Sequence, residues 1–180
     1  PEVIAAQSDL EIVYTPIHGT GITLVPKVLE AYGFKNVHVV EEQATPDGNF
    51  PTVAYPNPEE SETMRIGLEK AKALNADILL GTDPDADRVG IAIPDKSGEF
   101  ILLNGNQTGS LLINYLVTRW KELGKISGKE FIAKTVVTTD LMDKIALNNG
   151  VKVYNTLTGF KHIGAVIRAL EGKEQFIGGG

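Results

Sequence analysis

The sequence contains no cysteine, which excludes disulfide bonds and thiolate chemistry within this chain. It has no apolar run of membrane-spanning length and no segment with the pattern of a signal peptide. Its 180 residues contain no basic block and carry a formal net charge of −6, so nucleic acid is not expected as a partner. Low-complexity segments are also absent. These absences favour an ordinary globular chain with neither a membrane nor a nucleic acid among its partners.

The composition agrees with this, since 42 % of the residues are hydrophobic and 22 % are charged. The length is enough for one large or two small domains. Strand and helix patterns alternate along the whole sequence, which predicts an α/β fold with helices covering the sheets. We place a domain boundary near Leu103, with one domain over residues 1–103 and a second over residues 104–180.

Short apolar runs predict eight strands, at residues 11–14, 37–40, 76–80, 89–93, 100–103, 132–137, 151–154 and 175–177. A first helix should contain Pro26 in its first turn and end near Tyr32, before Gly33. Further helices are predicted at residues 57–74, 107–123, 140–148 and 161–170. Asn57 is expected to cap the first of these, and Tyr115 and Trp120 are expected to belong to the core.

Three aspartates alternate in the segment from Gly81 to Arg88, at Asp83, Asp85 and Asp87. Apolar runs on both sides predict buried strands, so the segment should be a loop at a strand end, where α/β sheets bind ligands. Carboxylates this close repel one another and raise each other's pKa, and a bound cation removes that cost. These features favour a metal site over a solvated acidic turn.

The donors around this loop are oxygen atoms, without a nearby cysteine or histidine, which favours Mg²⁺, Ca²⁺ or Mn²⁺ over zinc. An EF-hand does not fit: with Asp83 as the first ligand, its glycine position is Arg88 and its glutamate position is Pro94. An arginine beside a cation is suited to bind a phosphoryl group.

Two other motifs leave alternatives open. Gly19 and Gly21 follow a strand as in a dinucleotide-binding fingerprint, but Leu24 occupies the third glycine position, so a tight turn is the better interpretation. The adjacent His18 could serve phosphate or proton transfer, or simply hold the turn by hydrogen bonds. The loop of residues 158–161 (TGFK) leads into a helix, which suits either an anion site or an ordinary capped helix with a surface lysine.

The acidic segment, residues 82–88 (TDPDADR), resembles the metal-binding loop of the α-D-phosphohexomutases, the phosphoglucomutase/phosphomannomutase family. Three more stretches resemble the branch of this family that contains phosphoglucomutase and phosphopentomutase. They are residues 15–21 (TPIHGTG), 56–60 (PNPEE) and 156–161 (TLTGFK). The four stretches follow the family's order over nearly the whole chain. The resemblance implies two consecutive three-layer α/β/α domains, the family's second domain and most of its third.

The resemblance also implies an activity. Such mutases are intramolecular phosphotransferases that move a phosphoryl group between positions 1 and 6, or 1 and 5, of a sugar phosphate through a phosphoserine and a bisphosphate. Mg²⁺ would be held by the three aspartates of the acidic loop, and the sugar phosphate would be glucose, mannose or pentose phosphate. The other expected partners are further domains of the same chain, and the expected location is the cytoplasm.

Individual roles follow from the same resemblance. Asp83, Asp85 and Asp87 are the expected metal ligands, and Arg88 is expected to bind phosphoryl oxygens. The expected ligands of the sugar phosphate are Thr158, Gly159 and Lys161 together with Arg88, and Arg88 and Lys161 are the expected catalytic residues.

The family's nucleophilic serine loop is missing from this sequence. Because the sequence also begins without methionine and stops in a run of glycines, we expect an excised piece of a longer protein that is inactive alone. Two alternatives differ in chemistry. One is a phosphatase with Asp83 as nucleophile, which leaves Asp87 and Arg88 unexplained, and the other is a non-catalytic module that binds metal or sugar phosphate.

Overall fold

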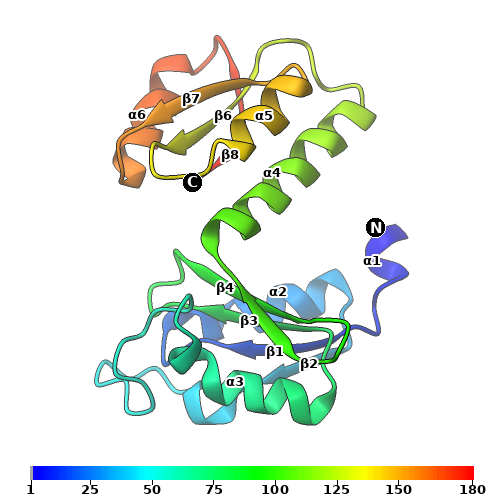
Figure 1. Ribbon diagram of the computed structural model, residues 1–180, viewed down its shortest axis with the longest axis vertical. Helices are drawn as coiled ribbons and strands as arrows, with labels where there is room; N and C mark the ends of the chain where they lie inside the picture. Colours follow the sequence, from blue (N-terminus) through cyan, green and yellow to red (C-terminus); the bar gives the residue numbers. More distant parts are fainter. Residues whose placement is uncertain (1) are drawn as a thin grey trace. The chain divides into compact units, whose positions relative to one another are not determined.

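The computed structural model describes residues 2–180, which form two compact units. The first unit ends at Asn104 and the second covers Gly105–Gly180. Each unit has its own sheet, of five strands in the first and three in the second (Figure 1). The predicted fold class, two consecutive α/β units with helices on their sheets, is therefore confirmed.

The first unit alternates strands and helices in its first half and ends in a β-meander. Its helices are α1 (Glu2–Ala5), α2 (Val25–Tyr32) and α3 (Ser61–Leu74), with short 3₁₀ turns η1 (Thr20–Thr23) and η2 (Glu41–Gln43). Its strands are β1 (Glu11–Thr15), β2 (Asn36–Val39), β3 (Ile78–Thr82), β4 (Val89–Pro94) and β5 (Phe100–Leu103).

The sheet order of the first unit is β2-β1-β3-β4-β5, in which β1, β2 and β3 are parallel and β4 and β5 are antiparallel to their neighbours. Helices α2 and α3 lie on opposite faces of this sheet (Figure 1). After β1 the chain turns toward β2 on one side, whereas after β3 it turns toward β4 on the other. The carboxyl ends of β1 and β3 are thus neighbours, and such divergence points are where open α/β sheets bind ligands.

The core of the first unit lies mainly between its sheet and α3. Buried apolar side chains pack there in one cluster, formed by Val13, Ile17, Val40, Met64, Ala71, Ala76, Leu79 and Ala92. Strand β1 is the most completely buried strand of this unit, because four of its five residues are buried. Removal of this apolar surface from water stabilises the strand that leads into the candidate site.

The second unit is built around a parallel sheet in the order β7-β6-β8. Its elements are α4 (Gly105–Glu122), β6 (Glu130–Thr135), α5 (Leu141–Asn148), β7 (Lys152–Thr156), α6 (Phe160–Leu170) and β8 (Gln175–Gly179). Helices α4 and α5 pack on one face of the sheet and α6 on the other (Figure 1).

The central strand β6 is buried along its whole length, and its side chains alternate between the two faces. Ile132 packs with residues of α4 and α5, whereas Phe131 and Ala133 pack with Ile163 of α6. By the same alternation Lys134 points to the face of Ile132, toward α5.

Three predictions about local structure need correction. Helix α3 begins at Ser61, not at residue 57, because Asn57 caps a turn instead: its side-chain Oδ1 accepts a hydrogen bond of 3.1 Å from the Glu59 backbone. Tyr115 is 64 % exposed and is not a core residue. Strand β4 is only partly buried, since Val89 at its start is exposed.

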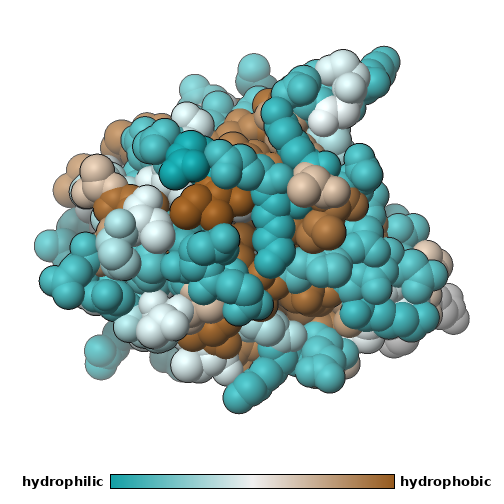
Figure 2. Space-filling view, turned by 90° about the horizontal axis from the view of Figure 1, so that it is seen from below, coloured by the Kyte–Doolittle hydropathy of each residue, from teal (hydrophilic) through white to brown (hydrophobic). Residues whose placement is uncertain are grey.

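The face shown in Figure 2 is mostly hydrophilic, and hydrophobic residues emerge there in several small areas. Over residues 2–180, none of the helices combines the length and the apolar character needed to cross a bilayer.

Candidate metal centre and anion-binding loop

The three aspartates of the acidic loop come together at the carboxyl end of β3. The loop joins β3 to β4, which are paired as an antiparallel hairpin with Thr82 opposite Val89. One carboxylate oxygen from each of Asp83, Asp85 and Asp87 lies within 4.8 Å of those of the other two. Asp83 is buried, whereas Asp85 and Asp87 are exposed.

Arg88 fixes the buried aspartate from both its backbone and its side chain. The Arg88 backbone N–H donates to Asp83 Oδ1 at 3.0 Å, and Arg88 Nε donates to Asp83 Oδ2 at 2.8 Å. The Arg88 guanidinium also lies 3.7 Å from Asp87 Oδ1 and is half-exposed. The arginine therefore closes the loop and still presents part of its side chain to solvent.

The electrostatics of the loop are unequal. Burial raises the pKa of Asp83, but the hydrogen bonds and positive charge of Arg88 outweigh burial and hold that pKa below its usual value. The pKa of Asp87 is raised, first by the negative charge of Asp83 and then by that of Asp85. The cluster therefore carries repulsion that Arg88 offsets only in part, and a cation would offset the rest.

The donor set fits a hard cation such as Mg²⁺. Two oxygen ligands of one ion can be about 5 Å apart at the Ca²⁺ distance of about 2.3–2.6 Å, but only about 4.2 Å apart at the Mg²⁺ distance of about 2.0–2.1 Å. The three carboxylate oxygens lie within 4.8 Å of one another, so they are close enough to share a Ca²⁺ ion and would have to approach by at most about 0.6 Å to share Mg²⁺. Only carboxylate oxygens contribute to the cluster, which suits Mg²⁺, Ca²⁺ or Mn²⁺ better than zinc.

The turn after β1 supports the acidic loop from the neighbouring strand. Thr20 donates two hydrogen bonds to the Pro84 carbonyl, from its backbone N–H at 2.8 Å and from Oγ1 at 3.1 Å. A Cβ atom at Gly19 would lie 2.4 Å from Pro84 Cα, and one at Gly21 would lie 2.3 Å from the Tyr14 hydroxyl. The two glycines therefore permit close packing against the acidic loop. This packing accounts for a glycine at each of the two positions in the turn.

His18 in the same turn is committed to hydrogen bonds. Its side chain is buried, with Nδ1 3.1 Å from the Thr45 carbonyl and Nε2 2.9 Å from Thr52 Oγ1. Because a carbonyl can only accept, Nδ1 is the donor to Thr45, and both ring nitrogens have a hydrogen-bond partner. Of the two interpretations of His18, this geometry favours a residue that holds the turn over one that transfers protons.

The second predicted site lies at the carboxyl end of β7, where residues 157–159 lead into α6. Gly159 occupies the N-cap position at φ 115°, and no side-chain hydrogen bond caps the helix there. Thr158, Gly159 and Lys161 are all exposed. The free N–H groups at a helix N-terminus, with a lysine beside them, can bind an anion such as a phosphate group. The described structure thus keeps these three residues together in the second unit and keeps the aspartates with Arg88 in the first.

Comparison with known families agrees with this arrangement of two α/β/α units, the first of which carries an acidic loop at a strand end. Residues 3–98 match the family described as phosphoglucomutase/phosphomannomutase, alpha/beta/alpha domain II. Residues 104–180 match domain III of the same family. Fold and sequence therefore define an α-D-phosphohexomutase type of chain. More specifically, the chain belongs to the phosphoglucomutase/phosphomannomutase family.

Individual relatives show the extent of the similarity. The chain is 39 % identical to a phosphoglucomutase of Staphylococcus epidermidis over 173 residues, which are 96 % of this chain and 31 % of that protein. A putative phosphomannomutase from Thermus thermophilus superposes with a TM-score of 0.72 at 22 % identity, over 99 % of this chain and 37 % of that one. An Aspergillus fumigatus N-acetylphosphoglucosamine mutase in complex with GlcNAc-6P and magnesium superposes with a TM-score of 0.60 at 17 % identity, over 89 % of this chain and 31 % of that one.

Two residues that hold the acidic loop from other parts of the chain have no local signal in the sequence. Thr20 and Tyr14 act on the acidic loop across more than 60 positions of sequence, so no local pattern marks them. Lys134 lies in the strand predicted at residues 132–137 and is buried, and a lysine in an otherwise apolar strand is a signal that marks it as unusual.

Proposed function

We propose that this chain supplies the Mg²⁺ site and a substrate-binding loop of a phosphosugar mutase. The mutase moves a phosphoryl group between positions 1 and 6, or 1 and 5, of a sugar phosphate through a phosphoserine and a bisphosphate. The observation that carries the proposal is the convergence of Asp83, Asp85 and Asp87 within 4.8 Å, beside an arginine paired to the buried member.

In this proposal the acidic loop acts on the phosphoryl group. Asp83, Asp85 and Asp87 hold Mg²⁺, which when bound offsets negative charge that develops during phosphoryl transfer. Arg88 orients Asp83 through Nε and turns its remaining N–H groups toward phosphoryl oxygens. The same residue therefore shapes the metal site and binds the group that is transferred.

The loop before α6 binds the phosphate that is not being transferred. Thr158 and Gly159 present a hydroxyl group and backbone N–H groups, and Lys161 adds a positive charge. Residues 1–103 accordingly form the metal-binding domain and residues 104–180 the sugar-phosphate-binding domain of the mutase. The phosphoserine comes from outside these 180 residues, and the proposal includes a cytoplasmic location.

The geometry disfavours the phosphatase alternative. A nucleophilic Asp83 would need an accessible carboxylate oxygen, but the residue is 2 % exposed and both oxygens accept hydrogen bonds from Arg88. Support for the mutase comes instead from the family membership, and from the phosphoglucomutases among the relatives.

The test uses a full-length protein that carries this chain, assayed for conversion of glucose 1-phosphate to glucose 6-phosphate and of the mannose and pentose analogues. Conversion should require Mg²⁺ and stop on chelation. Asp85→Ala should lower turnover by about 100-fold or more, because the remaining acids cannot complete the coordination sphere. Arg88→Lys should also lower it, because a point charge replaces a planar multidentate donor.

Asp9→Ala is the control, since Asp9 lies in an exposed surface ion pair with Lys35 in the same unit. A full-length protein that converts none of the three sugars would refute the proposal, as would one indifferent to chelation and to the loss of Asp85.

A further inference from the structure

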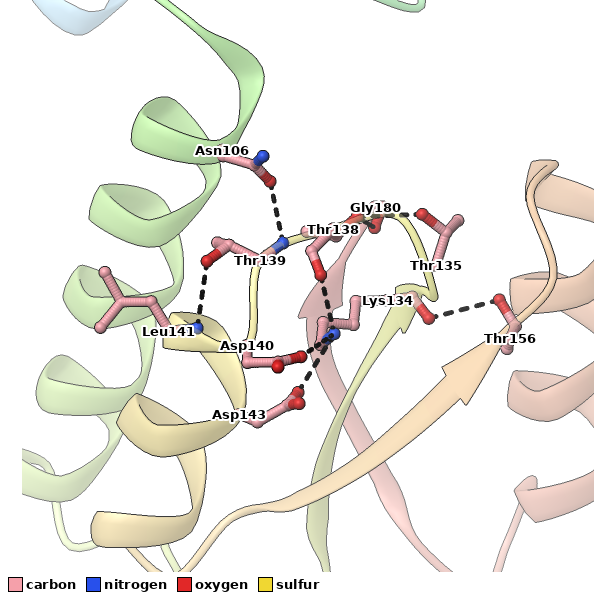
Figure 3. Close-up of polar contacts among 10 residues, drawn as sticks. All are labelled: Asn106, Lys134, Thr135, Thr138, Thr139, Asp140, Leu141, Asp143, Thr156 and Gly180. Carbon is pink, nitrogen blue, oxygen red and sulfur yellow. Dashed lines mark hydrogen bonds and ion pairs between the residues drawn. The ribbon is translucent and has the colours of Figure 1, made fainter.

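A buried lysine lies at the carboxyl edge of the sheet in the second unit. Lys134 of β6 is 2 % exposed, and its Nζ donates a hydrogen bond of 3.0 Å to the Thr138 carbonyl. The same Nζ lies 3.5 Å from Asp143 Oδ1 and 3.8 Å from Asp140 Oδ1 (Figure 3). An ammonium group is costly to bury unless it is paired and hydrogen-bonded, and these contacts supply both.

The contacts of Lys134 shape residues 135–140, from the last residue of β6 to the start of α5, which we call the lysine-centred loop. Within it the Thr138 N–H donates to the Thr135 carbonyl at 3.0 Å, and the two threonine hydroxyls lie 2.9 Å apart. The Thr139 N–H donates to Asn106 Oδ1 at 2.9 Å. Figure 3 shows the loop wrapped around the lysine nitrogen, so Lys134 acts at the centre of these bonds.

The lysine-centred loop is hydrogen-bonded to the end of β7, which leads into residues 157–161; we call these residues the anion-binding loop. The Val136 N–H donates to the Thr156 carbonyl at 2.8 Å, and Thr156 Oγ1 lies 3.4 Å from the Lys134 carbonyl, which accepts from it. Thr156 is buried and is the last residue of β7, two positions before Thr158. The position of Thr156, and thus the start of the anion-binding loop, depends on residues 134 and 136.

Stability alone is a poor explanation for a lysine at this position. The neighbour on the same face, Ile132, belongs to an apolar cluster, and an apolar side chain avoids the cost of desolvating a charge. Within residues 2–180, Asp143 Oδ1 is buried without a hydrogen bond and faces the lysine through an ion pair only. The charged cluster therefore fixes a particular loop geometry where an apolar residue would only fill space.

We propose that Lys134 is a positioning residue for sugar-phosphate binding. It holds the lysine-centred loop in place, and this loop in turn fixes the strand end from which Thr158, Gly159 and Lys161 project. The inference rests on the proposed function, because it assigns Lys134 to the phosphate site of the mutase.

Four variants of the full-length protein separate positioning from general stability. Lys134→Met keeps length but removes charge, and Lys134→Arg keeps charge. The double variant Lys134→Met with Asp143→Leu also removes the carboxylate that Lys134→Met leaves buried and unpaired. Lys152→Met is the matched control, because Lys152 pairs with Glu174 at the amino end of β7, away from the anion-binding loop.

The measurements are the KM and kcat for the sugar phosphate that the wild-type protein converts, its dissociation constant, and the thermal midpoint. Lys134→Met should raise KM and the dissociation constant about tenfold, by analogy with the loss of a group that orients a ligand at a metal site, and should lower the midpoint. The double variant should recover the midpoint but not the affinity. Lys134→Arg should recover part of the affinity, and Lys152→Met should match the wild type.

The outcomes distinguish this inference from the proposed function. If affinity recovers together with the midpoint in the double variant, or if Lys134→Met binds as tightly as the wild type, Lys134 is only structural and the inference is wrong. If the wild-type protein neither converts nor binds any of the three sugar phosphates, the proposed function is wrong and the inference falls with it.

Discussion

The three aspartates of the acidic loop differ in how firmly they are held. Asp83 is buried and accepts two hydrogen bonds from Arg88, whereas Asp85 and Asp87 are exposed. We infer that Asp83 is the fixed point of the metal site and that the other two adjust around an ion. The charge of Asp83, and after it that of Asp85, raises the pKa of Asp87, and a bound cation would oppose this repulsion.

His18 is predicted to stabilise the first unit without taking part in chemistry. His18→Ala removes hydrogen bonds to the Thr45 carbonyl and the Thr52 hydroxyl and leaves both groups without that partner. We expect a loss of about 2–3 kcal/mol in the free energy of unfolding, measured by urea denaturation. The control is His162→Ala, at a half-buried position on α6. This variant should change the free energy of unfolding by less than about 1 kcal/mol. A His18→Ala variant as stable as the wild type would contradict the bonding described here.

Glu130 gives the second unit a predictable response to acid. Burial raises the pKa of Glu130, but hydrogen bonds from Ser127 and Gly128 outweigh burial and leave that pKa below the ordinary value of 4.5. Since the folded-state pKa is the lower one, the contribution to stability is complete above the unfolded-state value and is lost as pH falls through the folded-state value.

Glu130→Gln should therefore lower the free energy of unfolding by about 1–2 kcal/mol at pH 7 and by less at pH 3. Denaturant unfolding at a series of pH values tests this, with the exposed Glu171→Gln as control. An equal loss at both pH values would show that the carboxylate charge of Glu130 is not responsible.

At the scale of elements, the turn after β1 should control the geometry of the metal site. A Cβ atom at Gly19 would meet the backbone of Pro84, which cannot move without displacing the acidic loop. Gly19→Ala should therefore weaken Mn²⁺ or Mg²⁺ binding about tenfold or more, by analogy with loss of an outer-shell support. Gly48→Ala, which would meet nothing within 4 Å, should leave binding unchanged. Titration of both variants with metal is the measurement, and equal affinities would contradict the supporting role.

Several elements could be predicted because their signals are local. The apolar runs beside the acidic loop gave β3 and β4, and helix α2 ends before Gly33 as expected. The start of α3 was wrong because residues 57–60 have a helix-start pattern but form a turn, with the Pro58 carbonyl so close to Gly90 that a Cβ there would lie 2.1 Å away. Packing against β4 thus outweighed the local preference of the segment.

The candidate sites could be predicted only in part, because a sequence pattern reveals neighbours along the chain but not contacts between distant segments. The acidic triad and the loop before α6 are each continuous in sequence, so their residue types and spacing were informative. The hydrogen bond from Thr20 to Pro84 and the ion pair between Lys134 and Asp143 join different parts of the fold. Such pairs follow from the fold and not from any local pattern, and a single sequence therefore does not reveal them.

At the scale of the whole molecule, the chain matches only 31 % of the length of the phosphoglucomutase from Staphylococcus epidermidis. We predict that these 180 residues alone do not convert glucose 1-phosphate, because the chain has only the proposed metal site and the proposed anion-binding loop and lacks the family's nucleophilic serine loop. A coupled assay of the purified chain with Mg²⁺ tests this, with a full-length protein as positive control. Robust conversion by the chain alone would refute the assignment of roles.

The most direct test of the central claim is binding of Mn²⁺, a paramagnetic substitute for Mg²⁺, measured by the loss of the free-ion electron paramagnetic resonance signal. The chain should bind one Mn²⁺ that Mg²⁺ displaces, and Asp85→Asn should weaken binding about tenfold or more, because the carboxylate charge is lost while the shape of the side chain is kept. Absence of binding to the wild-type chain, or equal binding by wild type and Asp85→Asn, would contradict the claim that Asp83, Asp85 and Asp87 form a metal site.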